Sequence, residues 1–170
     1  MSANCPWRVG IGYDIHRLAD GVRLKLGGVE IDHPRGLAGH SDGDAVLHAI
    51  ADAFLGAAGQ PDIGEQFPDT DPAYEGKDSC ELLGAVVRRI NAAGFVPVNV
   101  DCIVHAEEPR ISPHKRRMAD TIAGLVGLPA GAVSVKATTH EGLGPIGGRQ
   151  GIACTATVLL ARRGDQAGND

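Results

Sequence analysis

The chain has 170 residues, of which 43% are hydrophobic, and a formal net charge of −5. Its length fits one domain around one core, and its acidic balance excludes a nucleic-acid binder, which needs a basic stripe to meet phosphates. The sequence shows no secretory leader and no run near the about 18 apolar residues that span a membrane. We therefore expect a cytoplasmic single domain over 1–170 without a nucleic-acid or membrane partner, with its core at 8–162 and a disordered polar tail at 163–170. The scattered cysteines, without a CxxC pair, predict reduced and mostly buried thiols.

Near the N-terminus, alternating residues predict a strand at 8–13, followed by a hairpin of 22–26 and 29–31 that turns at Gly27-Gly28. Asp14 and His16 come where this first strand is expected to end. Side chains two apart on a strand point to the same face, so the two residues could reach one ion together. Ile15 should then face the other way, into the core.

The pattern changes at Asp42, which we expect to cap a helix with one apolar stripe running to Leu55. His48 lies on this helix, four residues after Asp44. Asp52 lies four residues further on, at the spacing that lets it accept a hydrogen bond from the second ring nitrogen of the histidine.

Residues 57–77 are interrupted by glycines and prolines and predict a long loop without regular structure. Loops of that length inside a compact domain are uncommon unless they are functional or disordered, so we expect a substrate flap. Asp62-Ile63-Gly64 and Phe67-Pro68-Asp69-Thr70-Asp71 within it have two interpretations. They are either plain turn chemistry or a set of acceptors for a polyhydroxylated ligand.

The second half predicts a helix that Asp78 or Ser79 caps and Gly94 ends, a strand at 96–104, and a helix from about Pro113. Two further strands are expected at 133–138 and 152–161. The whole pattern predicts an α/β (α+β) fold, with a mixed β-sheet layered with about three helices plus a β-hairpin.

The strongest chemical pattern is the set of Asp14, His16 and His48. One carboxylate and two imidazoles suit a borderline divalent ion such as zinc, and a three-residue set leaves the fourth tetrahedral position open, as in working sites. An isolated histidine is more often a hydrogen-bonded surface or core residue than a metal ligand. His33 and His114 have no metal-ligating residue at a suitable spacing, so we expect them to be surface residues.

A second pattern ends the strand at 133–138, where Thr138 and Thr139 precede Glu141 and a glycine-rich stretch. The stretch is either a simple loop or a place where hydroxyls, a carboxylate and free N–H groups meet a phosphate bridged by a magnesium-type ion. The sequence contains neither a P-loop nor a GxGxxG motif that opens a helix, so ordinary nucleotide folds are excluded.

Together these motifs, in order, closely resemble the 2-C-methyl-D-erythritol 2,4-cyclodiphosphate synthase family over residues 8–162. The residues that carry the resemblance are Asp14-Ile15-His16, His40-Ser41-Asp42-Gly43-Asp44 with His48, Asp62-Ile63-Gly64, Phe67-Pro68-Asp69-Thr70-Asp71-Pro72, Asn99-Val100-Asp101, Lys136-Ala137-Thr138-Thr139 with Glu141, and Gly151-Ile152-Ala153-Cys154.

The resemblance implies a phosphorus-oxygen lyase of the non-mevalonate (MEP) route to isoprenoids and terpenoids. In this reaction the 2-phosphate of 4-diphosphocytidyl-2-C-methyl-D-erythritol 2-phosphate attacks the β-phosphorus, and CMP leaves as the cyclic diphosphate forms. Nucleophile and electrophile share one molecule, so the enzyme mainly has to fold its substrate in line and neutralise charge.

The resemblance also assigns roles to residues. Asp14, His16 and His48 would hold zinc or a similar divalent ion, Glu141 a magnesium or manganese ion on the substrate diphosphate, and His40 and Thr139 would stabilise the transition state. The substrate contacts that it implies, metal ligands included, are Asp14, His16, His40, Ser41, Asp62, Ile63, Gly64, Phe67, Pro68, Asp69, Thr70, Asp71, Ala106, Pro109, Arg110, Ser112, Thr138, Thr139 and Glu141.

A homotrimer with active sites between subunits is implied as well. The chain departs from the family pattern in its last glycine loop, where Pro145 and Gly148 replace a common aromatic residue and arginine, and Arg149 lies one place along. Binding of an anion or isoprenoid phosphate in the central channel of the trimer therefore does not follow from the resemblance.

Two other functions fit parts of the pattern. A zinc-dependent phosphohydrolase would use water at the open metal position instead of an internal phosphate. A non-catalytic trimeric binding module would keep the metal and nucleotide sites without turnover. The presence of Thr139 and Glu141, to which the resemblance assigns roles in catalysis, argues against such a module.

Overall fold

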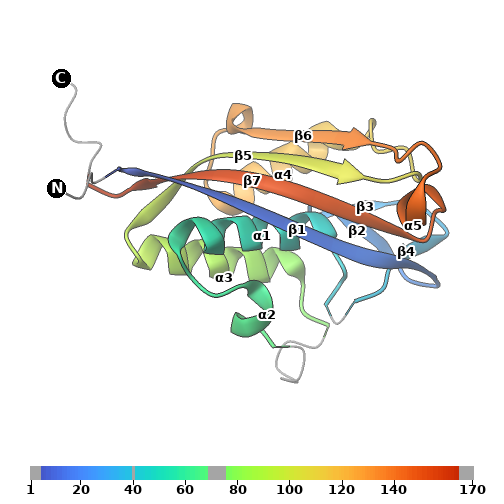
Figure 1. Cartoon of the computed structure of the whole chain (residues 1–170), viewed down its shortest axis with the longest axis horizontal. Coiled ribbons are helices and arrows are strands. Elements are labelled where there is room, and N and C mark those ends of the chain that lie inside the picture. Colours follow the sequence, from blue (N-terminus) through green and yellow to red (C-terminus); the bar gives the residue numbers. More distant parts are fainter. Residues whose placement is uncertain (1–4, 40, 69–75, 165–170) are drawn as a thin grey trace.

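The computed structural model describes residues 5–39, 41–68 and 76–164. A five-stranded mixed sheet in the order β4-β1-β7-β5-β6 forms its centre, and in Figure 1 the long strands run side by side. The β5/β6 pair is parallel, and the other pairs of this sheet are antiparallel. The strands are β1 (Trp7–Asp20), β4 (Arg35–Leu37), β5 (Phe95–His105), β6 (Val133–Thr138) and β7 (Gly151–Arg162).

Three long helices, α1 (Ala45–Ala58), α3 (Ser79–Ala92) and α4 (Lys115–Val126), pack on one face of this sheet (Figure 1). The apolar stripe of each helix explains the packing. Leu47, Ile50 and Phe54 of α1 and Met118 and Ile122 of α4 are at most 1% exposed. Short helices α2 (Ile63–Gln66) and α5 (Gly144–Gly147) and a 3₁₀ turn (Ala130–Ala132) complete the chain. The predicted α+β class, with a mixed sheet and three main helices, is confirmed.

The hairpin is also confirmed, with β2 (Leu24–Leu26) and β3 (Val29–Ile31) paired in a separate two-stranded sheet. Gly27 and Gly28 have φ angles of 60° and 73°. A side chain at either position would be strained, which is why this turn takes glycine.

The first strand is longer than predicted. It continues to Asp20 because β7 pairs with it from Trp7 to Arg17 and β4 pairs with it from Leu18 to Asp20, so Asp14 and His16 lie within the strand and not at its end. The prediction for Ile15 was wrong. Its side chain is 47% exposed, because it lies on the sheet face opposite the helices.

Other boundaries shifted or were missed. Short β4 is added to the sheet by pairing with β1, and α5 lies in the glycine-rich loop. The 57–77 segment is not a loop throughout, since α1 extends to Ala58 and α2 follows; residues 69–75 lie outside the described part. Asp78 caps α3 as predicted, by accepting a hydrogen bond from Cys80 N–H at 2.8 Å.

Of the four free cysteines, Cys102 and Cys154 are buried, Cys80 is half-buried and Cys5 is exposed. Arg163 follows β7 and donates its backbone N–H to Gly94 O at 2.7 Å, whereas residues 165–170 lie outside the described part. A search of the described helices finds none with the length and hydropathy that a membrane crossing requires.

Candidate active site

Asp14, His16 and His48 come together as the pattern predicted. Asp14 Oδ2 lies 2.9 Å from His16 Nε2 and 3.1 Å from His48 Nδ1, and the two ring nitrogens are 3.2 Å apart. A tetrahedral zinc with bonds of about 2.0–2.1 Å separates its ligand atoms by roughly 3.3 Å. The three atoms therefore form one face of a tetrahedron only slightly tighter than a zinc site. Within the described part of the chain, this is the group of three that could hold an ion.

Hydrogen bonds on the far side of each ring orient the two histidines. His16 Nδ1–H donates to Ala38 O at 2.8 Å, which leaves Nε2 free to bind a metal. His48 Nε2 lies 2.9 Å from Ser79 Oγ and 3.1 Å from Ser41 Oγ. Because the Ser79 hydroxyl donates to Asp42 Oδ1, its oxygen accepts from His48 Nε2–H, and Nδ1 faces the metal position.

The prediction that Asp52 orients His48 was therefore wrong. Asp52 Oδ1 instead accepts the backbone N–H of Ile63 at 2.8 Å. This hydrogen bond connects the start of α2 to α1, one helical turn after His48. The serine hydroxyls take the orienting role because the segment before α1 and the start of α3 place them within 3.1 Å of His48 Nε2. No sequence signal marks them as partners of a histidine.

Proximity of these groups also sets their protonation. Burial raises the pKa of Asp14, but the hydrogen bonds from His16 and His48 outweigh it and hold the pKa well below its usual value. The hydrogen bond to Asp14 raises the pKa of His16 against the opposing effect of burial. The metal-free cluster thus binds protons in the place where an ion would bind.

Two glycines on β1 allow His48 to reach this cluster. A Cβ atom at Gly12 would lie 2.0 Å from Ala49 O, and one at Gly10 would lie 1.9 Å from Ala53 O. Both glycines point at the backbone of α1, which can therefore lie directly on the strand. The sequence pattern placed both glycines in the strand at 8–13 but did not indicate that the helix carrying His48 packs directly on them.

Asp44, not Asp42, caps α1. Its fully buried carboxylate accepts the N–H groups of Val46 and Leu47, both at 3.1 Å, and those of Gly27 and Gly28 at 2.8 and 2.7 Å. Burial raises the pKa of Asp44, while the bonds from Gly28 and Gly27 oppose the rise. This residue ties the hairpin to the start of the helix that carries His48.

The segment after α1 places the predicted substrate residues beside this helix. Asp62 is exposed and caps α2 by accepting Glu65 N–H at 2.9 Å, and Ile63 and Pro68 are half-buried. Gly64 is exposed, whereas Phe67 is 8% exposed and belongs to the core cluster, with the Arg89 guanidinium 5.2 Å from its ring centre. His40, Asp69, Thr70 and Asp71 lie outside the described residues.

A pocket of 250 Å³ lies beside the ends of β5 and β6. Six of the predicted contacts line it, among them Thr138 and Thr139, and sequence reasoning missed three others. The lining residues are Ala106, Glu107, Pro109, Arg110, Ile111, Ser112, Ala137, Thr138 and Thr139. Glu107 also accepts the backbone N–H of His140 at 3.2 Å, so it joins the two walls.

Thr139 and Glu141 lie at this end of β6 and contact each other, since Thr139 Oγ1 donates to Glu141 Oε1 at 3.0 Å. Glu141 has a φ of 50°, in the left-handed region that is uncommon for a residue with a side chain. His140 Nε2 lies 3.3 Å from His105 Nδ1, and burial together with the His140 charge lowers the pKa of His105. This histidine pair was also missed.

The two groups of site residues lie at the same end of the sheet but apart. Ile15, Ala153, His105 and Thr138 pair in register across β1, β7, β5 and β6, which is three strand spacings of about 4.8 Å. Asp14 and His16 point to the helix-covered face, whereas Thr138 points to the opposite face with Ile15. Thr138 therefore lies on the other side of the sheet from the Asp14/His16/His48 cluster.

His33 is not a surface residue, contrary to the prediction. Its side chain is 11% exposed, with Nδ1 2.8 Å from Arg35 O and Nε2 3.6 Å from Glu108 Oε1. Glu108 also binds Arg35 at 2.5 Å and Arg149 at 3.4 Å, and its pKa is lowered chiefly by Arg35. His114 is half-buried before α4.

Residues 7–161 match the YgbB family. The chain belongs to that family. A YgbB relative from Bordetella pertussis, a 2-C-methyl-D-erythritol 2,4-cyclodiphosphate synthase, is 55% identical over 161 residues that cover 95% of this chain and 99% of the relative. A synthase of the same name from Salinibacter ruber is 52% identical over 153 residues, which are 90% of this chain and 98% of the relative.

Solved YgbB structures have the same fold. The bifunctional IspDF from Campylobacter jejuni matches with a TM-score of 0.89 and 40% identity, over 92% of this chain and 42% of that longer protein. The CDP complex of IspF from Plasmodium falciparum matches with a TM-score of 0.81 and 36% identity, over 92% of this chain and 97% of that one.

Proposed function

We propose that this protein converts 4-diphosphocytidyl-2-C-methyl-D-erythritol 2-phosphate to 2-C-methyl-D-erythritol 2,4-cyclodiphosphate and CMP, as a phosphorus-oxygen lyase of isoprenoid precursor biosynthesis. The observation that carries the proposal is the Asp14/His16/His48 cluster, which is open on one side, in a chain 55% identical to a synthase of that name. An oxygen of the substrate 2-phosphate forms a bond to the β-phosphorus, and the bond from that phosphorus to the CMP oxygen breaks.

Asp14, His16 and His48 are the residues that we propose hold a zinc-like ion. When bound, such an ion supplies Lewis acidity and a fixed positive charge beside a phosphate. The chain's own contribution is orientation. Ala38 O and the serine hydroxyls hold both imidazoles with one nitrogen toward the cluster, so the rings need no reorientation when an ion displaces the cluster's protons.

Glu141 is the proposed protein ligand of a magnesium or manganese ion on the substrate diphosphate. The neighbouring Thr139 hydroxyl donates to the Glu141 carboxylate in the free protein. When Glu141 binds the ion, this hydroxyl would turn and, with His40, donate to the phosphoryl oxygens as charge develops. The pocket at Ala106, Pro109, Arg110, Ser112 and Thr138 is proposed to take the cytidine end, because Thr139 also lines it. Ser41 and the segments 62–64 and 67–71 would meet the phosphate and methylerythritol parts.

A homotrimer is proposed to bring these two groups together. Within one chain, Thr138 and the Asp14/His16/His48 cluster lie on opposite faces of the sheet, separated by three strand spacings or roughly 14 Å. We therefore infer that a single substrate takes one group from each of two neighbouring chains. The uncovered sheet face supports this assembly, because Val9, Ile11, Tyr13 and Ile15 on β1 are 70%, 72%, 56% and 47% exposed. A contiguous apolar face of this kind is typical of a subunit interface.

Phosphorus NMR of the purified protein with its cytidine substrate, zinc and magnesium tests the reaction. We expect CMP and a cyclic diphosphate in equal amounts. A linear diphosphate or free orthophosphate would instead favour a zinc-dependent phosphohydrolase and would rule out the cyclase. Light scattering tests the assembly separately, with a trimer expected for the native chain and a monomer for Ile11→Asp.

A further inference from the structure

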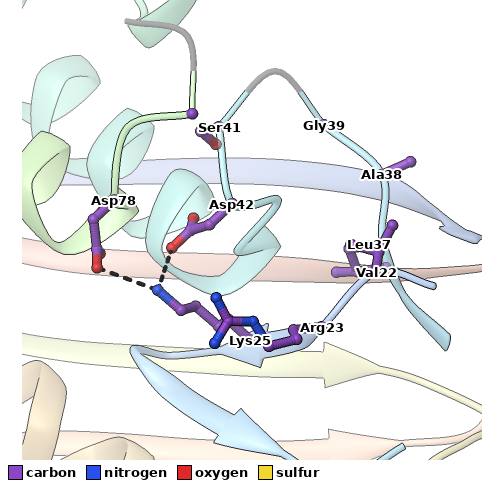
Figure 2. Close-up of a pocket in the computed structure, with 10 residues that line it drawn as sticks. Val22, Arg23, Lys25, Leu37, Ala38, Gly39, Ser41, Asp42 and Asp78 are labelled. Atoms are coloured by element: carbon purple, nitrogen blue, oxygen red, sulfur yellow. Dashed lines mark hydrogen bonds and ion pairs between the residues drawn. The ribbon is translucent and has the colours of Figure 1, made fainter. Parts of the chain in front are cut away.

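Lys25 of β2 lies in a pocket of 480 Å³ (Figure 2). Ala38 and Ser41 also line this pocket, and they contact the His16 and His48 rings of the metal cluster. The Lys25 ammonium lies between two carboxylates, with Nζ 3.1 Å from Asp42 Oδ2 and 3.2 Å from Asp78 Oδ2. Asp42 precedes α1, and Asp78 caps α3. One lysine therefore joins the starts of two helices, and its side chain, 27% exposed, is largely withdrawn from solvent.

A continuous line of hydrogen bonds runs from this lysine to the metal cluster. Lys25 holds Oδ2 of Asp42, and the other oxygen, Oδ1, accepts the Ser79 hydroxyl and the Ser79 N–H. Ser79, which is 1% exposed, accepts in turn from His48 Nε2–H at 2.9 Å. His48 Nδ1, on the other side of the ring, faces Asp14 and His16.

We propose that Lys25 is a positioning residue for His48, acting through Asp42 and Ser79 to hold the imidazole with Nδ1 toward the metal. The inference rests on the metal site of the proposed function and adds to it a residue that touches neither the ion nor the substrate. Groups behind a metal-bound histidine fix its ring orientation and raise its basicity, and their loss lowers metal affinity.

The charge of Lys25 determines the position of the Asp42 carboxylate. The Asp42 and Asp78 carboxylates contact the same nitrogen, so removal of the ammonium would leave two negative charges facing each other with no cation between them. Repulsion would then turn the Asp42 carboxylate away from Ser79 and free the imidazole. The hydrogen bond that Lys25 donates to Asp42 raises the pKa of the lysine despite its partial burial, so it stays charged at neutral pH.

The pocket also offers a matched control. Arg23 is two residues earlier on the chain and lines the same pocket, but its side chain is 80% exposed and pairs with Glu30 at 3.8 Å (Figure 2). Arg23→Met removes one positive charge from the pocket without touching Asp42. Lys25→Met keeps the alkyl chain and removes only the ammonium.

The test measures zinc dissociation constants against a chromophoric chelator, the visible absorption of the cobalt-substituted protein, and the Tm of the metal-free protein. We expect Lys25→Met to weaken zinc binding roughly tenfold, the lower end of the range for outer partners of metal ligands, and to shift the cobalt bands. Arg23→Met should stay within about twofold of the native protein, as for an exposed ion pair.

An Asp78→Asn background provides a second measurement. Asn still caps α3, while the repulsion that follows loss of the lysine is removed, so Lys25→Met should weaken zinc binding less there than in the native chain. If Lys25→Met alone folds poorly, comparing Asp78→Asn with the double variant still tests the role of the lysine.

Three outcomes would overturn the inference. If Lys25→Met lowers the Tm but leaves zinc affinity and cobalt bands unchanged, the lysine only stabilises the helix junction. An equal loss in Arg23→Met would point to a general charge effect. If the native protein binds no zinc, the proposed metal site fails with the inference; if only the Lys25 effect is missing, the metal site stands.

Discussion

The metal cluster and the Thr138–Glu141 segment differ in how much of their surroundings one chain supplies. Asp14, His16 and His48 have side chains 25%, 19% and 13% exposed, and each histidine has an orienting partner on its far side. Thr139 and Glu141 are exposed, and they contact each other. The Asp14/His16/His48 cluster is preorganised by its own chain, whereas the Thr138–Glu141 segment is open, as the proposal that substrate and a neighbouring chain complete it requires.

The largest effect on the cluster should come from His48→Ala. Loss of a direct ligand is expected to remove bound zinc and to lower kcat/KM by more than about 100-fold, beyond the range for outer partners. Metal analysis and steady-state kinetics check this. His114→Ala is the control, because that side chain makes no cap hydrogen bond at the start of α4. Full zinc content in the His48 variant would overturn the ligand assignment.

A second way to break the cluster leaves its ligands untouched. Gly12→Ala should destabilise the protein by about 3 kcal/mol or more, at the upper end of overpacking costs, because the added methyl would meet the backbone of α1. Gly56→Ala is the matched change on the exposed side of α1, with nothing within 4 Å, and should stabilise by about 0.5–1 kcal/mol. Urea unfolding measures both, and equal effects would refute the close approach of helix and strand.

Changes in the open segment should separate the two regions. Glu141→Gln is expected to leave zinc content and Tm unchanged, because the side chain is exposed, and to raise the magnesium concentration needed for half-maximal activity about tenfold. Magnesium titrations of the zinc-loaded enzyme measure this half-maximal concentration. Zinc loss in this variant would mean that the two regions are coupled within one chain.

The smallest expected effect is a pH dependence confined to the cluster. The His16 pKa is raised in the metal-free protein, so its contribution to stability is complete below the unfolded value near 6.5 and is lost as pH rises through the folded value. Zinc competes with that proton, so zinc affinity should fall as pH decreases through the same window. Tm curves of metal-free and zinc-loaded protein from about pH 6 to 9 check both signs; a metal-free Tm that rises across this window would contradict the assignment.

Most of the secondary structure and the grouping of Asp14, His16 and His48 could be predicted from the sequence, because local spacing indicates them. Apolar stripes place α1, α3 and α4, and Asp14 and His16 share a strand face whatever the length of the strand. What could not be predicted depends on contacts between distant segments. β7 extends β1, the hairpin amides select Asp44 over Asp42 as the cap, and Ser79 rather than Asp52 meets His48.

The glycines show the same limit. Gly27 and Gly28 could be predicted as a turn because two neighbouring glycines between short strands have a local meaning. Gly10 and Gly12 alternate in a strand, where their role appears only once α1 lies against them. Predictions for His40 and for Asp69 to Asp71 concern residues outside the described part and stay predictions.

The two faces of strand β1 differ in the residues that they present and in what those residues contact. Its even-numbered positions Gly12, Asp14 and His16 face α1, and its odd-numbered positions Ile11, Tyr13 and Ile15 form the exposed apolar face. Deleting a single residue within this strand would exchange the two faces, because side chains alternate with a period of two. Metal ligands would then point outward and apolar side chains toward α1, so insertions and deletions here should be tolerated far less than substitutions at either face.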